Sequence, residues 1–163
     1  MKSFLLKCAL MFFSLVAVCG ATHAQNPGEL EMIKELWGME KKAMLDEYMQ
    51  FSQTEVMAFW PLYDEYMAEK QAIVQSRMRT LQDYAQNLTT LTDDKARELT
   101  NDVLDQDSSL NKLRKKYYKK MSKATSPLRA SEFFQLERYL DTTISSEIQE
   151  SIPFIGEINA LKQ

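Results

Sequence analysis

Side chains that could carry out acid–base chemistry occur in this sequence as adjacent pairs, at Asp64-Glu65 and Asp93-Asp94. Two carboxylates that share a proton have to face the same point in space. Neighbouring residues of a helix point about 100° apart, so neither pair shares a helix face. Solvation explains both pairs better than catalysis does, and we expect no carboxylate dyad.

The other residues suited to catalysis or metal binding are two cysteines and one histidine, and all three lie early in the chain, at Cys8, Cys19 and His23. Without residues 1–24, no thiol and no imidazole remains. Disulfides, zinc sites of the Cys/His type and nucleophilic Ser–His or Cys–His pairs are then excluded. The sequence therefore predicts no enzyme, no catalytic residue, no cofactor and no metal site.

Residues 1–24 have the features of an export signal. Two lysines give a positive start, an apolar run too short to span a membrane follows, and small residues precede Gln25. Lipid attachment at Cys19 is the alternative, but Val18 stands where lipid-anchoring motifs carry Gly or Ala. We therefore predict a signal peptide at 1–24 and one domain at 25–163, exported in a bacterium to the periplasm.

The composition after the signal favours helix throughout, because glycine and runs of β-branched residues are nearly absent. A first helix is predicted from about 29 to 49. Ser52 and Glu55 then form a capping box that opens a long helix ending near Asn87. Pro61 lies inside this helix and predicts a kink in its second turn.

Two further helix starts follow. Thr92 precedes two acidic residues, which the positive end of a helix dipole favours. Ser126-Pro127 opens the last helix, with proline at the first position, where it costs no hydrogen bond. Pro153 and Gly156 are expected to end this helix.

An apolar stripe at helical spacing follows the second and third predicted helices. It is interrupted near Lys70 and Gln71, and again at Gln106. Its members are Val56, Phe59, Tyr63, Met67, Val74, Met78, Leu81, Ala85 and Leu88, then Leu99, Val103, Leu110, Leu113, Tyr117 and Met121.

Two of the predicted helices approach about 30 to 35 residues, which makes each about 45 to 50 Å long. Such rods are longer than a compact domain of this size is wide. A thin helical layer cannot bury both of its faces, and a homodimer is the natural remedy. We predict an all-α fold of four helices in elongated hairpins that pairs as a homodimer.

The opening of the second helix recurs in the fourth. Ser52 is followed after two turns by Phe59-Trp60, and Ser126 by Phe133-Phe134. Each serine can accept a hydrogen bond from a backbone N–H that the first helical turn leaves unsatisfied. The repetition predicts two related helical hairpins.

A run of basic residues interleaved with two tyrosines ends the third helix. A solvated helix terminus that complements the dipole is the interpretation we favour. The alternative is a surface that attracts acidic or partly unfolded proteins. Nucleic acid is not an expected partner, because the exported chain keeps 18 of its 20 Lys and Arg against 23 acids, a formal charge of −5. The run is Lys112, Arg114, Lys115, Lys116, Lys119, Lys120 and Lys123, with Tyr117 and Tyr118.

The aromatic residues after the two openings are most simply core, because aromatic rings bury a large apolar area. Alternatively, some line an exposed concave face and contact other proteins there. Methionines are interpreted as adaptable packing in preference to soft-metal ligands. Candidate client-binding residues are Phe59, Trp60, Tyr63, Phe133, Phe134, Lys115, Lys116, Tyr117, Lys119 and Lys120.

The strings around the two openings resemble the signatures of Spy/CpxP-like periplasmic proteins. The first is Phe59-Trp60-Pro61-Leu62-Tyr63 after Phe51-Ser52-Gln53-Thr54-Glu55, and the second runs from Ser126-Pro127 to Phe133-Phe134-Gln135-Leu136-Glu137. The family carries a repeated Leu-Thr-x-x-Gln motif, from which this chain departs with Phe-Ser-x-x-Glu and with a Ser-Pro start. The resemblance covers most of residues 45–150 and is to a divergent branch of the family.

The resemblance implies a cradle-shaped antiparallel homodimer of four-helix subunits. It also implies either an ATP-independent periplasmic chaperone or a modulator of envelope-stress and metal-stress signalling. We hypothesise a chaperone-like protein that binds exposed hydrophobic segments of unfolded clients under envelope stress. The alternatives are a regulator that docks on the periplasmic domain of a sensor, and metal binding through carboxylates or methionines. No integral membrane span is expected after signal removal.

Overall fold

The computed structural model of the chain describes residues 41–150, Pro153 and Ile155. The predicted signal peptide and most of the predicted first helix lie outside these residues. The chain divides into two compact units, 1–43 and 44–163, and the three long helices all belong to the second. Every regular element of its described residues is a helix, which confirms the all-α part of the predicted fold.

A helix that ends at Met49 precedes the three long helices. Its end agrees with the predicted one. The next residue, Gln50, takes the left-handed conformation with φ 46°, and its N–H donates to the carbonyl of Asp46 at 3.0 Å. A left-handed residue cannot continue a right-handed helix, so the chain turns here toward the next element.

Helix α3 (Gln53–Asn87) begins with the predicted capping box. The Ser52 hydroxyl accepts from the N–H of Glu55 at 3.4 Å, and the Glu55 carboxylate accepts from the N–H of Ser52 at 2.9 Å. These reciprocal bonds satisfy two backbone donors that the first turn leaves open. The helix continues through Pro61, which lies on its exposed side, and ends at the predicted Asn87.

Helix α4 (Asp93–Ala124) is capped by Thr92, whose hydroxyl accepts from the N–H of Lys95 at 3.3 Å. Helix α5 (Pro127–Glu150) begins at the predicted proline, and the hydroxyl of Ser126 accepts from the N–H of Arg129 at 3.2 Å. Both starts are confirmed. Pro153, the predicted end signal, is no longer helical.

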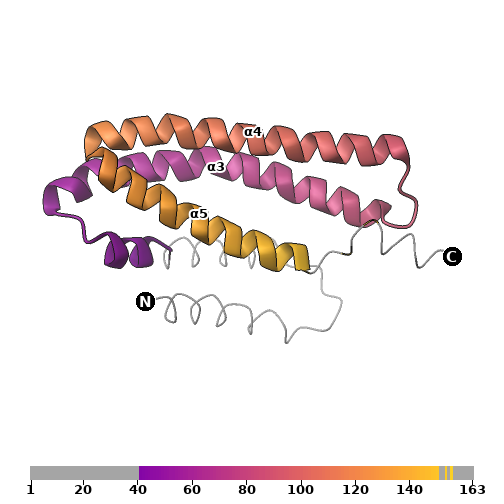
Figure 1. Cartoon of the computed structure of the whole chain (residues 1–163), viewed down its shortest axis with the longest axis horizontal. Coiled ribbons are helices and arrows are strands. Elements are labelled where there is room, and N and C mark those ends of the chain that lie inside the picture. The colour runs from indigo at the N-terminus through magenta and orange to yellow at the C-terminus, as the bar shows by residue number, and fades with distance from the viewer. Residues whose placement is uncertain (1–40, 151–152, 154, 156–163) are drawn as a thin grey trace. The chain divides into compact units, whose positions relative to one another are not determined.

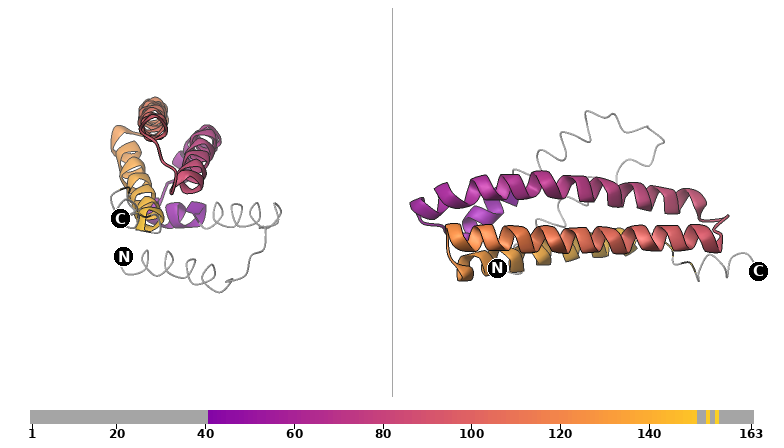
Figure 2. Two further views of the ribbon diagram at one scale, coloured as in Figure 1. Left: turned by 90° about the vertical axis from the view of Figure 1, so that its right-hand side faces the viewer. Right: turned by 90° about the horizontal axis from the view of Figure 1, so that it is seen from above.

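Helices α3 and α4 run antiparallel as a long hairpin, and α5 packs on α4 (Figure 1). Figure 2 shows α3, α4 and α5 end-on at three corners, with α5 starting beside the end of α4 and then diverging from it. The two repeated helix openings meet in this arrangement, because the Arg129 guanidinium contacts the Glu55 carboxylate at 3.1 Å. Arg129 also donates to the carbonyl of Met49.

The core lies where the three helices converge and is made largely of aromatic rings. Phe59 of α3 meets Phe133 of α5 edge-on, with ring centroids 5.1 Å apart, and Tyr66 meets Tyr117 of α4 at 5.5 Å. Edge-to-face contacts of this kind stabilise a core beyond the area they bury. Leu45, Met49, Tyr63, Leu113, Met121, Ala130, Leu136 and Leu140 complete the cluster.

The predicted apolar stripe is buried only in part. Val74 and Met78 of α3 were expected to continue it, but both are about half exposed. Among the three described long helices, the far parts of α3 and α4 pack on each other beyond the stretch that contacts α5, and the hydroxyl of Tyr84 in α3 donates to the carbonyl of Pro153 at 2.9 Å. In this part of the molecule, the face of α3 that packs against α4 contains Ser76 and Thr80. Their hydroxyls accept hydrogen bonds from Gln106 of α4.

Candidate functional site

Four charged side chains from all three long helices meet beside the aromatic core. Lys70 Nζ of α3 lies 2.6 Å from Oε1 of Glu137 and 2.6 Å from Oδ1 of Asp141, both on α5. Arg114 of α4 contacts the other oxygen of Asp141 at 2.8 Å. Glu137 is fully buried, and Lys70 is 6% exposed. Two cations and two anions balance, as a buried ionic cluster requires.

This cluster explains the interruption of the predicted stripe at Lys70, and it was not foreseen. The sequence alone shows that Lys70 interrupts the apolar stripe of one helix and that Glu137 follows the apolar Leu136 in another. Predicting that Lys70 and Glu137 pair required knowing that these side chains of α3 and α5 meet in the fold. The arrangement can hold helices together, and it contains no thiol, imidazole or hydroxyl nucleophile.

Buried tyrosines surround the same region. Burial is the main reason that the pKa values of Tyr63 and Tyr66 lie far above the ordinary value of 10, and the negative charge of Glu137 adds to the effect. Burial also raises the pKa of Tyr117, together with the hydrogen bond that its hydroxyl donates to Glu69 at 2.7 Å. These phenols therefore stay protonated, and the hydroxyl of Tyr117 acts as a hydrogen-bond donor.

Four of the predicted client-binding residues lie inside the core. Phe59, Tyr63, Phe133 and Tyr117 are essentially inaccessible to solvent, which favours the core interpretation of these rings. Trp60 is half-buried and packs against the core cluster. In this arrangement of the helices, none of the four buried rings is available to another protein.

The basic run of α4 divides between two faces. Lys116 contacts Glu69 of α3 at 2.7 Å, and Lys120 contacts Glu65 at 2.7 Å. Both ammonium groups also lie over the ring of Tyr117, 5.2 and 4.6 Å from its centroid. Hydrogen bonds from these lysines are the largest cause of the lowered pKa values of the two glutamates. Lys116 and Lys120 thus join α4 to α3.

Lys115 and Lys119 instead lie along a groove between α4 and α5 together with Phe134, three of the ten predicted residues. The groove has a volume of about 920 Å³. The rings of Tyr118 and Phe134 meet there with centroids 6.2 Å apart. The groove is lined by Asp107, Asn111, Arg114, Lys115, Tyr118, Lys119, Phe134, Gln135 and Arg138, so four cations face one carboxylate.

Arg138 lines the groove but is not among the predicted client-binding residues, although its position in the sequence indicates this placement. It follows Phe134 by one helical turn, and residues four apart share a helix face. If Phe134 of α5 faces the basic part of α4, then Arg138, one helical turn further along α5, is expected to face it as well. The groove between α4 and α5 is the candidate binding site.

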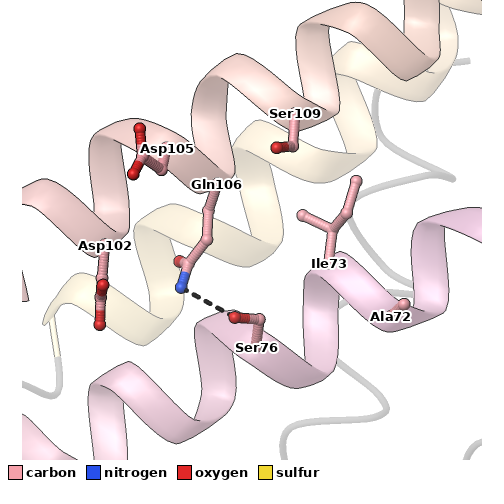
Figure 3. A pocket seen from close by; sticks show the side chains of 7 residues that line it. All are labelled: Ala72, Ile73, Ser76, Asp102, Asp105, Gln106 and Ser109. Atoms are coloured by element: carbon pink, nitrogen blue, oxygen red, sulfur yellow. Dashed lines mark hydrogen bonds between the residues drawn. The ribbon is translucent and has the colours of Figure 1, made fainter.

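A second hollow, of about 320 Å³, lies between α3 and α4 (Figure 3). Gln106 reaches across it and donates from Nε2 to the hydroxyls of Ser76 at 3.2 Å and Thr80 at 2.9 Å. Asp102 and Asp105 stand at its edge. These groups explain the polar interruption of the stripe at Gln106, and they hold the two helices together without offering a reactive group.

Within residues 41–150, 153 and 155, no three His, Cys, Asp or Glu side chains are placed to hold a metal ion. None of the helices in this part of the chain combines the length and apolarity needed to cross a bilayer.

Comparison with protein-family models, with curated proteins and with solved structures found no match for this chain.

Proposed function

We propose that this protein is a non-enzymatic, ATP-independent chaperone-like protein of the periplasm that binds exposed segments of partly unfolded clients. The observation that carries the proposal is the groove between α4 and α5, where two aromatic rings stand among four cations. Tyr118 is 38% exposed and offers its ring to solvent. Rings bind apolar side chains without demanding a sequence, which suits varied clients.

The charge of the groove selects among such segments. Lys115, Lys119 and Arg138 are exposed at its rim, whereas Arg114 is engaged with Asp141. A client segment that combines a large apolar side chain with acidic neighbours matches both components. Long-range attraction by the cations accelerates encounter, and contact with the rings then retains the segment.

The test is the aggregation of a chemically denatured, acidic client protein, with and without this protein at equal molar amounts. We expect the protein to delay aggregation, and Tyr118→Ala with Arg138→Gln to lose most of the delay. Tyr139→Ala is the matched control, because Tyr139 is a similarly exposed tyrosine of α5, 46% accessible, that does not line the groove. An unchanged aggregation rate with the unaltered protein rejects the proposal.

The Spy/CpxP-like family, the periplasmic location and action under envelope stress belong to the same proposal. They are supported by the resemblance of the two helix openings and by the signal-like first 24 residues. The homodimer expected from the thin helical layer is likewise proposed.

A second candidate is a regulator that docks on the periplasmic domain of a sensor. The groove favours it in one respect, since a bounded site of defined charge suits a single partner. Affinity capture from bacterial envelopes separates the two functions. One dominant partner in equal amount supports the regulator, whereas many partners in small amounts support the chaperone.

A further inference from the structure

The amide of Gln106 is fixed in one orientation in the hollow between α3 and α4. Its Nε2 donates to the hydroxyls of Ser76 and Thr80. The Thr80 hydroxyl donates its single proton to the carbonyl of Ser76 at 3.3 Å, so toward Gln106 it can only accept. Oxygen therefore cannot take the place of nitrogen next to Thr80, and the amide oxygen faces away from the two hydroxyls.

That oxygen, Oε1 of Gln106, has no hydrogen bond. Gln106 is 7% exposed, and no group in the described part of the chain donates to Oε1. Figure 3 shows the amide in the hollow, with its nitrogen toward Ser76 and its oxygen turned to the side where Asp102 stands. Buried polar atoms usually have a partner, so an open acceptor at this position indicates that a donor binds in the hollow.

Two carboxylates at the edge of the hollow lack a counterion. Asp102 and Asp105 are one turn apart on α4, and both line the hollow. Three other acids of this helix, Asp94, Glu98 and Asp107, each form an ion pair. Within residues 41–150, neither Asp102 nor Asp105 forms one. The donor that the hollow favours is therefore positively charged.

The α3 side of the hollow is partly apolar. Ala72 and Ile73 line it, and Ile73 is a partly buried side chain that packs against the core cluster. The volume of about 320 Å³ is at the small end of the range of ligand pockets. A ligand that matches all of these features is small, and it combines a cationic head with a short hydrocarbon chain.

We propose that the hollow between α3 and α4 binds a primary alkylammonium group. Such a group carries one positive charge and three N–H donors. Oε1 of Gln106 and the carboxylates of Asp102 and Asp105 supply three acceptors, which match the donors in number. The alkyl chain then lies against the apolar side of the hollow, where its contact with water is reduced.

A hard metal ion matches the hollow less well. Calcium and magnesium are surrounded by oxygen ligands. The side chains of Ala72 and Ile73 offer no oxygen on one side of the hollow, whereas a hydrocarbon chain makes use of that side. Calcium is therefore the competing ligand in the test.

The inference goes beyond the proposed function, because different residues line the hollow and the groove. The test is titration of the purified full chain with n-pentylammonium chloride, followed by the NMR signals of the Gln106 side-chain amide. We expect a saturable shift with a Kd in the millimolar range, since exposed charges contribute little. n-Pentanol has the same chain without the charge and should bind at least about tenfold more weakly. Calcium chloride at the same concentration should leave the signals unshifted.

Two variants test the residues of the hollow. Asp102→Asn with Asp105→Asn removes both charges from exposed positions, and Gln106→Leu removes the amide oxygen. Each should raise the Kd for n-pentylammonium at least about tenfold, because hydrogen bonds to a charged group are strong. The backbone amide of Ser109, which also lines the hollow, reports binding in the Gln106 variant. Circular dichroism verifies that each variant keeps its helices.

The matched control is Asp46→Asn with Glu47→Gln, which removes the same charge from exposed positions outside the hollow. Its Kd should equal that of the unaltered protein. Nα-Acetyl-lysine methylamide is the second probe. If it binds more tightly than n-pentylammonium, the ligand is a lysine side chain of another protein, and if it binds more weakly, the ligand is a free amine.

Three results overturn the inference. The first is the absence of a saturable shift, which means that the hollow takes up water only. The second is binding of n-pentanol as tight as that of n-pentylammonium, or tighter binding of calcium. The third is an unchanged Kd after the replacement of Asp102 and Asp105, or an equal loss in the matched control.

Discussion

Replacement of Lys70 by methionine tests whether the buried charges hold the three helices together. The ammonium lies 2.6 Å from both Glu137 and Asp141, and Glu137 is fully buried. Methionine keeps most of the side-chain length and removes the charge, so the Glu137 carboxylate loses that ammonium inside the core. Breaking a buried ion pair on one side costs about 3–5 kcal/mol. Domains of this size are stabilised by only about 5–15 kcal/mol, so the loss is large.

The free energy of unfolding is measured by urea titration followed by far-ultraviolet circular dichroism. Glu137→Leu should destabilise the protein less than Lys70→Met, because Lys70 keeps its contact with Asp141. The double variant should be more stable than Lys70→Met alone by at least about 1 kcal/mol, since no carboxylate then remains at position 137. Asp141 keeps the Arg114 guanidinium at 2.8 Å.

Lys116→Met is the matched control for a lysine in an exposed pair. Its partner Glu69 is about half accessible, and pairs of this kind contribute at most about 1 kcal/mol. A cost of Lys70→Met no greater than that of Lys116→Met would refute the reasoning. So would a double variant as unstable as Lys70→Met, because the buried carboxylate would then not be the source of the loss.

Three further predictions concern the helix ends, the surface ion pairs and the polar position of the stripe. Ser52→Ala and Ser126→Ala should each lower the free energy of unfolding by about 1 kcal/mol, as loss of a helix cap does, and thermal melting measures this. The lowered pKa values of Glu65 and Glu69 stabilise the folded state above the unfolded pKa of these side chains. That stability should be lost as the pH falls through their folded pKa, and Glu65→Gln with Glu69→Gln should flatten the acid limb of the stability curve. Gln106→Leu should cost less than about 1 kcal/mol, because leucine continues the apolar stripe while Thr80 keeps its bond to the carbonyl of Ser76, and a urea titration that shows a larger loss would contradict this.

The ends of the helices followed from the sequence because capping is local. The serine at 52 and the glutamate at 55 bond to each other's backbone across three positions, so their types alone predict the start of α3. The starts of α4 and α5 and the end of α3 at Asn87 were predicted for the same reason. The predicted stripe also named the core residues Phe59, Tyr63, Leu113, Tyr117 and Met121, because helical periodicity places them on the core-facing sides of α3 and α4.

The partners of charged residues followed only from the tertiary structure. Lys70 and Glu137 are 67 positions apart, and nothing in either local sequence connects them. The neighbours Lys115 and Lys116 are indistinguishable by composition, yet one lies along the groove and the other binds α3. Adjacent helical residues point about 100° apart, so the packing of neighbouring helices decides which charge is paired and which stays open. Apolar periodicity in the sequence shows which residues share a face of a helix. Only the packing of the helices shows whether that face contacts another helix or solvent.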